Sequence, residues 1–537
     1  MNLVKWVCFY LFFSSSLSAQ TYNEILGRPT DSSITISILF DQNVQVYWEY
    51  GITAGSNNHS TLTYTAVVDT PLEVDFINLL PDTKYYYRTR YRAIGATLFL
   101  AGAEHNFQTK RSAGSTFTFT VEADEHLYDR SQGSANLYKI TLQNQQKDSG
   151  DFMISLGDIF GDDHTPYTST SADMKAKHLY YRKFLGAICH SVPFYVCLGN
   201  HEGENDFYLN QTPPNNIACY ATLWRKFYYP NPYPNNFYTG NTNVEGFGIG
   251  QPQNYYAWNW GDALLVVLDI YRDQCDTSAD PKKWAWTLGL PQYSWFKNIL
   301  ENSTAKYKFV FAHHPNGQQR GGISAARLYE WGGYEINGAG NLVYKFDTKR
   351  PGWAKPVHQL MVDNGVNIFF QGHDHLFAKE VLDGVIYQEV PMAADSTYSS
   401  GVNFWSNFYS QNVINGSGHI RVNVAPDCIN VNYIQAYLPA DTAGINKNRQ
   451  VAFSYSTGVC ASVNTYLFIG NGNWNVAANW SNNLIPPAIL PSTNNIIIDP
   501  MAGGTCVLNV TQRISSGANL TVKSGKFFVI PGLLIIQ

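Results

Sequence analysis

Five apolar stretches in the middle of the chain each end abruptly in polar side chains of a restricted kind. From about residue 116 these stretches alternate with helical segments, which is the pattern of an α/β layer fold. Ligands of such folds collect at the carboxyl ends of the strands. We therefore expect one crevice to gather the residues that follow the five strands: Asp124-Glu125-His126, Gly157-Asp158, Gly199-Asn200-His201, His313-His314 and Gly372-His373-Asp374-His375.

The side chains in these segments are carboxylates, imidazoles and one amide, without a cysteine. Oxygen and nitrogen donors of this kind suit Zn, Mn, Fe or Ni rather than an iron–sulfur cluster. The spacing Asp124-x-His126 lets two side chains reach one ion, and His373-x-His375 allows the same or a grip on two ions. Two ions about 3.5–4 Å apart stabilise both the attacking and the leaving oxygen of a displacement at phosphorus, and one carboxylate must lie between them. We therefore expect two divalent transition-metal ions.

In this order, the five segments resemble the motifs of the calcineurin-like metallophosphoesterases, over about residues 116–435. The resemblance implies a domain at 115–438, a two-sheet β-sandwich flanked by helices with the metals at one edge. It implies two sets of metal ligands that share Asp158. The first set also contains Asp124, His126 and His375, and the second also contains Asn200, His313 and His373.

The same resemblance implies the catalytic roles. A hydroxide between the ions would be the nucleophile, and Asp158 would hold both ions. His201 would be the outer-sphere acid that protonates the leaving group, and it would contact the substrate together with Asn200. The role of His314 stays open, and Arg320 could meet a substrate phosphate, as could Lys379, although no spacing requires it.

Residues 21–112 contain short alternating strands with turns between them, which predicts a β-sandwich. The stretches Tyr47–Gly51, Leu80–Arg88 and Phe107–Thr109 resemble a fibronectin type III domain. Purple acid phosphatases carry a similar sandwich before their catalytic domain, and the alternative is an adhesion module unrelated to catalysis. In that family a tyrosine three residues after the bridging aspartate binds ferric iron, whereas this chain has Gly161 there and His126 in the first segment. We therefore expect a colourless enzyme that uses divalent ions.

The two ends of the chain have other patterns. Residues 1–19 resemble a secretory signal, because Lys5 precedes a short apolar run from Trp6 to Phe13 and small residues follow. They predict a secreted, periplasmic or cell-surface protein, and no later run is long enough to span a membrane. We expect a linker at 439–463 and a β-rich module at 464–537, a small solenoid or sandwich. That module offers a candidate contact to a cell surface or to glycans.

Charge, cysteines and loops complete the expectations. The formal charge of −5 gives no sign of nucleic-acid binding. Cys219 and Cys275 are a candidate disulfide pair. The segments 203–254 and 316–355 contain Pro, Asn and Gly and are expected as long loops that shape the substrate cleft.

Two classes of function are open on this evidence. The first is an exported phosphohydrolase, a phosphomonoesterase with a phosphodiesterase or nucleotide-directed phosphoesterase as the alternative. The second is a surface-binding protein with a vestigial central domain. The intact set of donors favours the enzyme, because a decayed site would have lost at least one of them.

Overall fold

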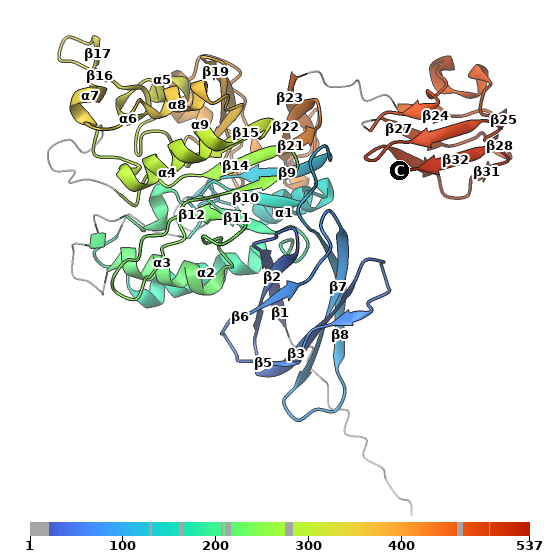
Figure 1. The fold of residues 1–537 in the computed structure, drawn as a ribbon, viewed down its shortest axis with the longest axis horizontal. Helices are drawn as coiled ribbons and strands as arrows, with labels where there is room; N and C mark the ends of the chain where they lie inside the picture. Colours follow the sequence, from blue (N-terminus) through green and yellow to red (C-terminus); the bar gives the residue numbers. More distant parts are fainter. Residues whose placement is uncertain are drawn as a thin grey trace, which may run out of the picture.

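The computed structural model describes residues 21–127, 131–160, 165–205, 208–209, 216–273, 283–458, 465–492 and 494–537. The described chain forms an N-terminal β-sandwich, a central α/β domain and a C-terminal β module (Figure 1). This confirms the predicted multidomain fold class. The predicted signal peptide lies outside the described residues. No described helix combines the length and apolar character needed to cross a membrane.

The N-terminal sandwich packs a three-stranded sheet against a larger one. The first sheet has the order β1 (Tyr22–Gly27), β2 (Ser33–Phe40) and β6 (Leu72–Ile77). The second contains β4 (His59–Ser60), β3 (Val44–Gly51), β7 (Lys84–Ala93) and β8 (Leu100–Gln108), and β5 (Tyr64–Ala66) also pairs with β3. Alternate residues face inward, as the period of a strand requires, and their core contains Ile36, Trp48 and Phe76.

The central domain is built from two sheets that pack face to face. The first has the order β11 (Phe194–Val196), β10 (Phe152–Ser155), β9 (Phe117–Glu122), β21 (Ser417–Ala425), β22 (Cys428–Ala436) and β23 (Val451–Gly458). The second has the order β12 (Thr239–Gly240), β13 (Tyr256–Trp260), β14 (Ala263–Val267), β15 (Tyr307–Phe311), β18 (Ile368–Gln371), β20 (Val385–Glu389) and β19 (Ala378–Leu382). The core between them contains Phe119, Phe309 and Phe370.

Helices cover the outer face of each sheet. Helices α1 (Ala135–Asp148) and α2 (Ser171–Leu185) share an apolar cluster with β10 and β11. Helices α4 (Gly289–Asn302) and α8 (Val357–Asp363) share another with β14, β15 and β18. This confirms the predicted two-sheet sandwich with flanking helices, in which strands buried on both faces are apolar throughout.

Both predicted long loops contain regular structure. Helix α3 (Ile217–Tyr228) lies in the first, and its buried residues recur at helical spacing, including Ile217, Ala221 and Tyr228. Asn216 caps the helix by accepting a hydrogen bond from the backbone N–H of Cys219. The second contains α5 (Ile323–Ala326), α6 (Tyr329–Gly332), β16 (Tyr334–Ile336), β17 (Leu342–Tyr344) and α7 (Phe346–Lys349). The predictions of irregular loops were therefore wrong over these segments.

Two further expectations differ from the structure. Part of the expected linker is strand β23, which pairs with β22 at the edge of the first sheet because Phe453 and Tyr455 pack on its core. Cys219 is a free, buried thiol, so the candidate disulfide with Cys275, a residue outside the described part, is wrong. Cys219 lies on the buried face of α3, where it serves as a small apolar side chain. Cys428 is disulfide-bonded.

The C-terminal module winds three times through three short strands. The parallel three-stranded sheets are β24 (Thr465–Phe468), β27 (Asn495–Ile498) and β30 (Asn519–Val522); β25 (Gly472–Asn473), β28 (Thr505–Val507) and β31 (Phe527–Val529); and β26 (Ile489–Leu490), β29 (Thr511–Ile514) and β32 (Leu533–Ile536). Successive strands of the chain belong to different sheets, so the module is a solenoid rather than a sandwich. Its interior holds Trp474, Trp480 and Ile496.

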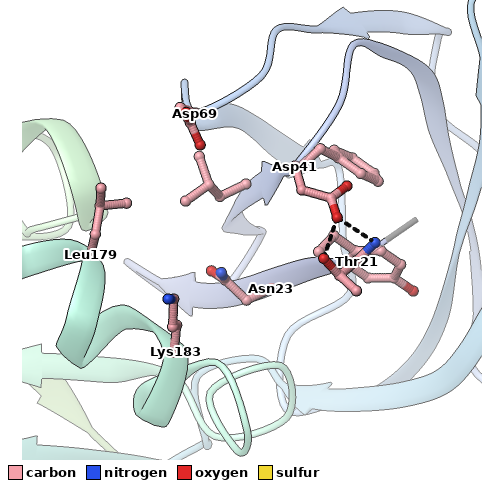
Figure 2. Close-up of a pocket in the computed structure, with 9 residues that line it drawn as sticks. Thr21, Asn23, Asp41, Asp69, Leu179 and Lys183 are labelled. Atoms are coloured by element: carbon pink, nitrogen blue, oxygen red, sulfur yellow. Dashed lines mark hydrogen bonds between the residues drawn. The ribbon is translucent and has the colours of Figure 1, made fainter. Parts of the chain in front are cut away.

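The N-terminal sandwich contacts the central domain through α2 and the turn that follows it. Arg182 of α2 donates hydrogen bonds to Asn23 Oδ1 (2.7 Å) and to the carbonyl of Ser37 (2.8 Å). A cavity of about 430 Å³ lies beside this contact, where Leu179 and Lys183 of α2 face residues of the sandwich (Figure 2). In its wall the Thr21 backbone N–H donates to Asp41 Oδ2 (3.2 Å), and this cavity includes none of the donors predicted from the five segments.

Candidate metal centre

The five predicted segments lie at adjacent strand ends of the two facing sheets. Asp124 and His126 follow β9, Asp158 follows β10, and Asn200 and His201 open the 3₁₀ turn η1 (Asn200–Glu202) after β11. His313 follows β15, and His373 with His375 follows β18. Strands β9, β10 and β11 are parallel neighbours, and so are β15 and β18, so their carboxyl ends meet at one edge.

Three groups of donors have ligand atoms that all lie within 4.8 Å of one another: Asp124, His126 and His375; His126, Asp158 and His201; and Asp158, His313 and His373. Asp158 belongs to two groups and lies between their histidines. Its Oδ2 is 3.5 Å from His126 Nε2 on one side and 3.1 Å from His313 Nε2 on the other. The structure therefore brings together all seven charged or imidazole residues that the sequence predicts for this site.

The backbone at these strand ends is strained. Asp124, His126, Asp158, His373 and His375 all have positive φ angles, between 42° and 80°. A left-handed conformation is uncommon outside glycine, and it persists at functional sites only where the surroundings impose it. Two glycines allow the close approach of the carboxylates. A Cβ on Gly199 would overlap Asp158 Oδ1, and one on Gly372 would lie 2.6 Å from Asp124 Oδ2.

Hydrogen bonds fix the two central carboxylates from behind. Asp158 Oδ1 accepts from the backbone N–H of His201 (2.8 Å), and Asp124 Oδ2 accepts from that of His373 (2.9 Å). Each bond joins one strand end to another and leaves the second oxygen to face the imidazoles. The orientation of each carboxylate is thus set before any ligand arrives.

Glu202 is a supporting residue that sequence reasoning missed. Its buried carboxylate accepts hydrogen bonds from the backbone N–H groups of Asp158 (3.0 Å), Ile159 (2.6 Å), Phe160 (3.2 Å) and Gly199. It thereby clamps the turn that carries Asp158 to the turn that carries Asn200. The only sequence signal was its place directly after the Gly-Asn-His segment.

The donor atoms have the chemistry that a cation requires. His313 Nδ1 lies 2.9 Å from the carbonyl oxygen of Leu156, so Nδ1 donates to that oxygen and Nε2 is the nitrogen that faces Asp158 and could bind a cation. Asn200 Oδ1 and His373 Nε2 are buried and have no hydrogen-bond partner among the described residues. Buried polar atoms without a partner are costly, and a bound cation would satisfy them. The residues present therefore fit metal ions.

The charges in the site shift the pKa values of its residues. Burial raises the pKa of Asp158, but the nearby His313 and His201 outweigh burial and hold it well below its usual range. Burial lowers the pKa of His313, but Asp158 and Asp124 outweigh burial and raise it to about 9. Burial and the Arg320 guanidinium hold the pKa of His373 well below its usual range. Asp158 is therefore an anion in this site, beside the imidazoles of His313 and His201.

The other polar residues predicted near the site have different surroundings. His314 is buried, its Nδ1 accepts from the backbone N–H of Asn316 (3.2 Å) and its Nε2 lies 3.2 Å from the Gly321 carbonyl, so it supports the loop. Arg320 donates from Nη1 to Asp374 Oδ1 (2.9 Å). Lys379 lies over the ring of Tyr455, 5.5 Å from its centroid.

Comparisons with known proteins agree with the fold of the central domain. Residues 117–377 match the family model of the calcineurin-like phosphoesterases. The structure of PhoD is similar over 81% of this chain and 90% of that one, with a TM-score of 0.57 and 17% identity. A purple acid phosphatase from the seeds of yellow lupin (Lupinus luteus) is similar over 81% of this chain and 74% of that one, with a TM-score of 0.51 and 13% identity. A comparison with curated proteins gave no match.

The fold and the donor groups define the central domain as that of a metal-dependent phosphoric ester hydrolase. More particularly, the chain contains a calcineurin-like phosphoesterase domain, and β21, β22 and β23 complete its first sheet beyond the matched residues.

Proposed function

We propose that the protein is an exported phosphomonoesterase with two divalent metal ions. The observation that supports this most strongly is the position of Asp158, whose Oδ2 lies 3.5 Å from His126 Nε2 and 3.1 Å from His313 Nε2, one donor of each proposed ligand set. One ion would be held by Asp124, His126, Asp158 and His375, and the other by Asp158, Asn200, His313 and His373. When bound, such ions supply Lewis acidity and lower the pKa of a coordinated water. The N-terminal apolar segment 6–13 supports export.

The residues of the chain itself would carry the remaining steps. Asp158 and Asp124 would fix the positions of both ions, because one oxygen of each carboxylate is already held by a backbone N–H group. His201 would donate a proton to the leaving oxygen, since its Nε2 lies 3.9 Å from Asp158 Oδ2, beside the two proposed ligand sets. Asn200 would orient a phosphoryl oxygen beside it.

The test is a substrate panel on the mature protein, loaded in turn with Zn, Mn, Fe or Ni. Phosphate monoesters, phosphate diesters and nucleotides would be compared by kcat/KM, with metal content measured on the same samples. Faster hydrolysis of monoesters with two ions bound would support the proposal. A preference for diesters or nucleotides would replace it with the second phosphoesterase function, and no hydrolysis with any ion would favour the surface-binding alternative.

A further inference from the structure

A small cavity beside His375 is lined mostly by residues that have no role in the proposed reaction. It measures about 180 Å³ and is lined by Gln132, Arg320, His375, Ser400, Phe404 and Trp405. His375 is also a member of the first donor group. The cavity therefore lies directly beside the candidate metal centre.

Arg320 forms a fixed wall of this cavity. Its Nη1 donates to the carbonyl of His373 (2.5 Å) and to Asp374 Oδ1, and its Cζ lies 4.1 Å from the centroid of the Trp405 ring. Its Nε and Nη2 make no hydrogen bond to a described residue, and its side chain is 22% exposed. A guanidinium held in this way presents a positively charged flat surface, which attracts the face of an aromatic ring.

Helix α9 (Ser400–Trp405) supplies three more of the lining residues, Ser400, Phe404 and Trp405. The helix rests directly on the backbone of Asp374 and His375, where a Cβ on Gly401 would have no room. Trp405 packs into an apolar cluster with Leu376. The side chain of Phe404, in contrast, is 66% exposed and lines the cavity. An uncovered aromatic side chain beside a site is available to pack on a ligand.

We propose that this cavity is the leaving-group subsite and that it takes the single aromatic ring of an aryl phosphate ester, such as a phenyl or tyrosyl phosphate. The inference rests on the proposed function. The volume fits one six-membered ring, since a cavity of about 150 Å³ in another protein holds benzene, and it is too small for a nucleoside. Hydrolysis uses water alone as co-reactant: the water oxygen bonds to phosphorus, the bond from phosphorus to the aryl oxygen breaks, and the phenol leaves with a proton that is balanced by one from the water.

The test uses phosphonates, which cannot be hydrolysed, so that leaving-group reactivity plays no part. Inhibition constants, and calorimetric binding to the metal-loaded protein, would be compared for benzylphosphonate, cyclohexylmethylphosphonate and methylphosphonate. We expect the benzyl compound to bind at least about tenfold more tightly than the methyl compound, the size of one cation–π contact with partial desolvation. We expect it to bind more tightly than the cyclohexyl compound as well.

Variants then assign the effect to the cavity. Phe404→Ala and Trp405→Leu should reduce the benzyl advantage to about threefold or less, while the constant for methylphosphonate stays within about twofold. Phe408→Ala is the matched control, because Phe408 is 46% exposed and 6.2 Å from Trp405 but does not line the cavity. It should keep the full advantage.

Several results would overturn the subsite. These are equal constants for the benzyl and methyl compounds, an unchanged ratio in Phe404→Ala, or a cyclohexyl compound that binds as tightly as the benzyl one. If the wild-type protein hydrolyses phosphate esters while any of these holds, the subsite fails and the proposed function stands. If no metal supports any hydrolysis, the proposed function itself fails.

Discussion

Asp158 is the residue on which two groups of donors depend, and its replacement gives the most direct test of a two-metal centre. An amide in place of this carboxylate cannot neutralise two cations, so Asp158→Asn should abolish hydrolysis and leave at most one ion bound. Metal content per protein chain measures this. Asp427→Asn is the control, since its side chain is 80% exposed at the turn between β21 and β22. Two tightly held ions in Asp158→Asn would contradict the bridging role.

His201 should matter for the chemical step and not for metal binding. Because it lies beside Asp158 and is proposed to donate a proton, His201→Ala should lower kcat roughly 10²–10⁴-fold, the usual contribution of a general acid. The loss should be smaller for p-nitrophenyl phosphate than for an alkyl phosphate, since a good leaving group needs no proton. Parallel kinetics and metal analysis measure this. Equal losses for both esters would exclude His201 as the acid.

The three residues that follow Asp158 are Ile159, Phe160 and Gly161, and the lack of a tyrosine among them predicts a colourless protein. Tyr167 is 67% exposed and packs against Tyr208, and the buried Tyr271 donates its hydroxyl to the Gly317 carbonyl (3.2 Å), with its ring 5.9 Å from that of His313. An imidazole in place of a phenolate holds ferric iron less firmly. Iron loading under air should therefore give no strong visible band. A strong band that disappears in Tyr271→Phe or Tyr167→Phe would contradict this assignment.

The donors themselves could be predicted from the sequence, because each follows an apolar strand and parallel strands end together. Glu202 could not, since nothing in its neighbours shows that the side chain turns back onto four backbone N–H groups. The wall of the cavity beside His375 could not be predicted from the sequence either. Arg320 and Trp405 are 85 residues apart in the chain, and only the tertiary fold brings the guanidinium over the ring.

Element by element, the sequence predicted the strands of the central domain better than the segments between them. The Pro and Asn residues around α3 suggested a loop, although Ile217, Ala221 and Tyr228 recur at helical spacing. Tertiary packing on α2 overrides the weak local signal there, because α3 buries one face against it. Strand β23 was missed because its outer face is polar, as an edge strand permits.

Strand β1 carries a buried carboxyl group that should make the stability of the fold depend on pH. Burial raises the pKa of Glu24 to about 7 from 4.5, although Thr89, Trp48 and Tyr87 donate hydrogen bonds to it. Between these pH values the unfolded chain has lost the proton while the fold still holds it. The free energy of unfolding should therefore fall by roughly 3 kcal/mol as the pH rises from 4.5 to 7.

Glu24→Gln should remove this dependence, because an amide has no proton to release. Urea unfolding of the wild type and the variant at several pH values measures the difference between them. The control is Glu49→Gln, on β3 of the same sandwich, whose side chain is 29% exposed and should leave the wild-type slope intact. A Glu24→Gln variant with the wild-type slope would show that Glu24 is ionised in the fold throughout this range.

At the scale of the whole molecule, the C-terminal solenoid is separate from the catalytic chemistry. In the described part of the chain, the backbone hydrogen bonds of the module join its own residues to one another. None of the predicted metal donors lies in it. Removal of residues 464–537 should therefore leave kcat/KM for soluble substrates within about twofold of the full chain. That truncation keeps β23, which pairs with β22 from Cys428 to Ile434 and covers the edge of the first sheet.

A second truncation tests whether β23 belongs to the catalytic domain. Removal of residues 446–537 also deletes β23, which exposes the edge of β22 and the core contacts of Phe453 and Tyr455. We expect that protein to unfold at a lower temperature and to aggregate, because an uncovered sheet edge pairs with other chains. Thermal unfolding and light scattering of both truncations measure this. If the shorter deletion folds but is inactive, the solenoid completes the active site; if the longer deletion is as stable as the shorter, β23 is not part of the catalytic domain.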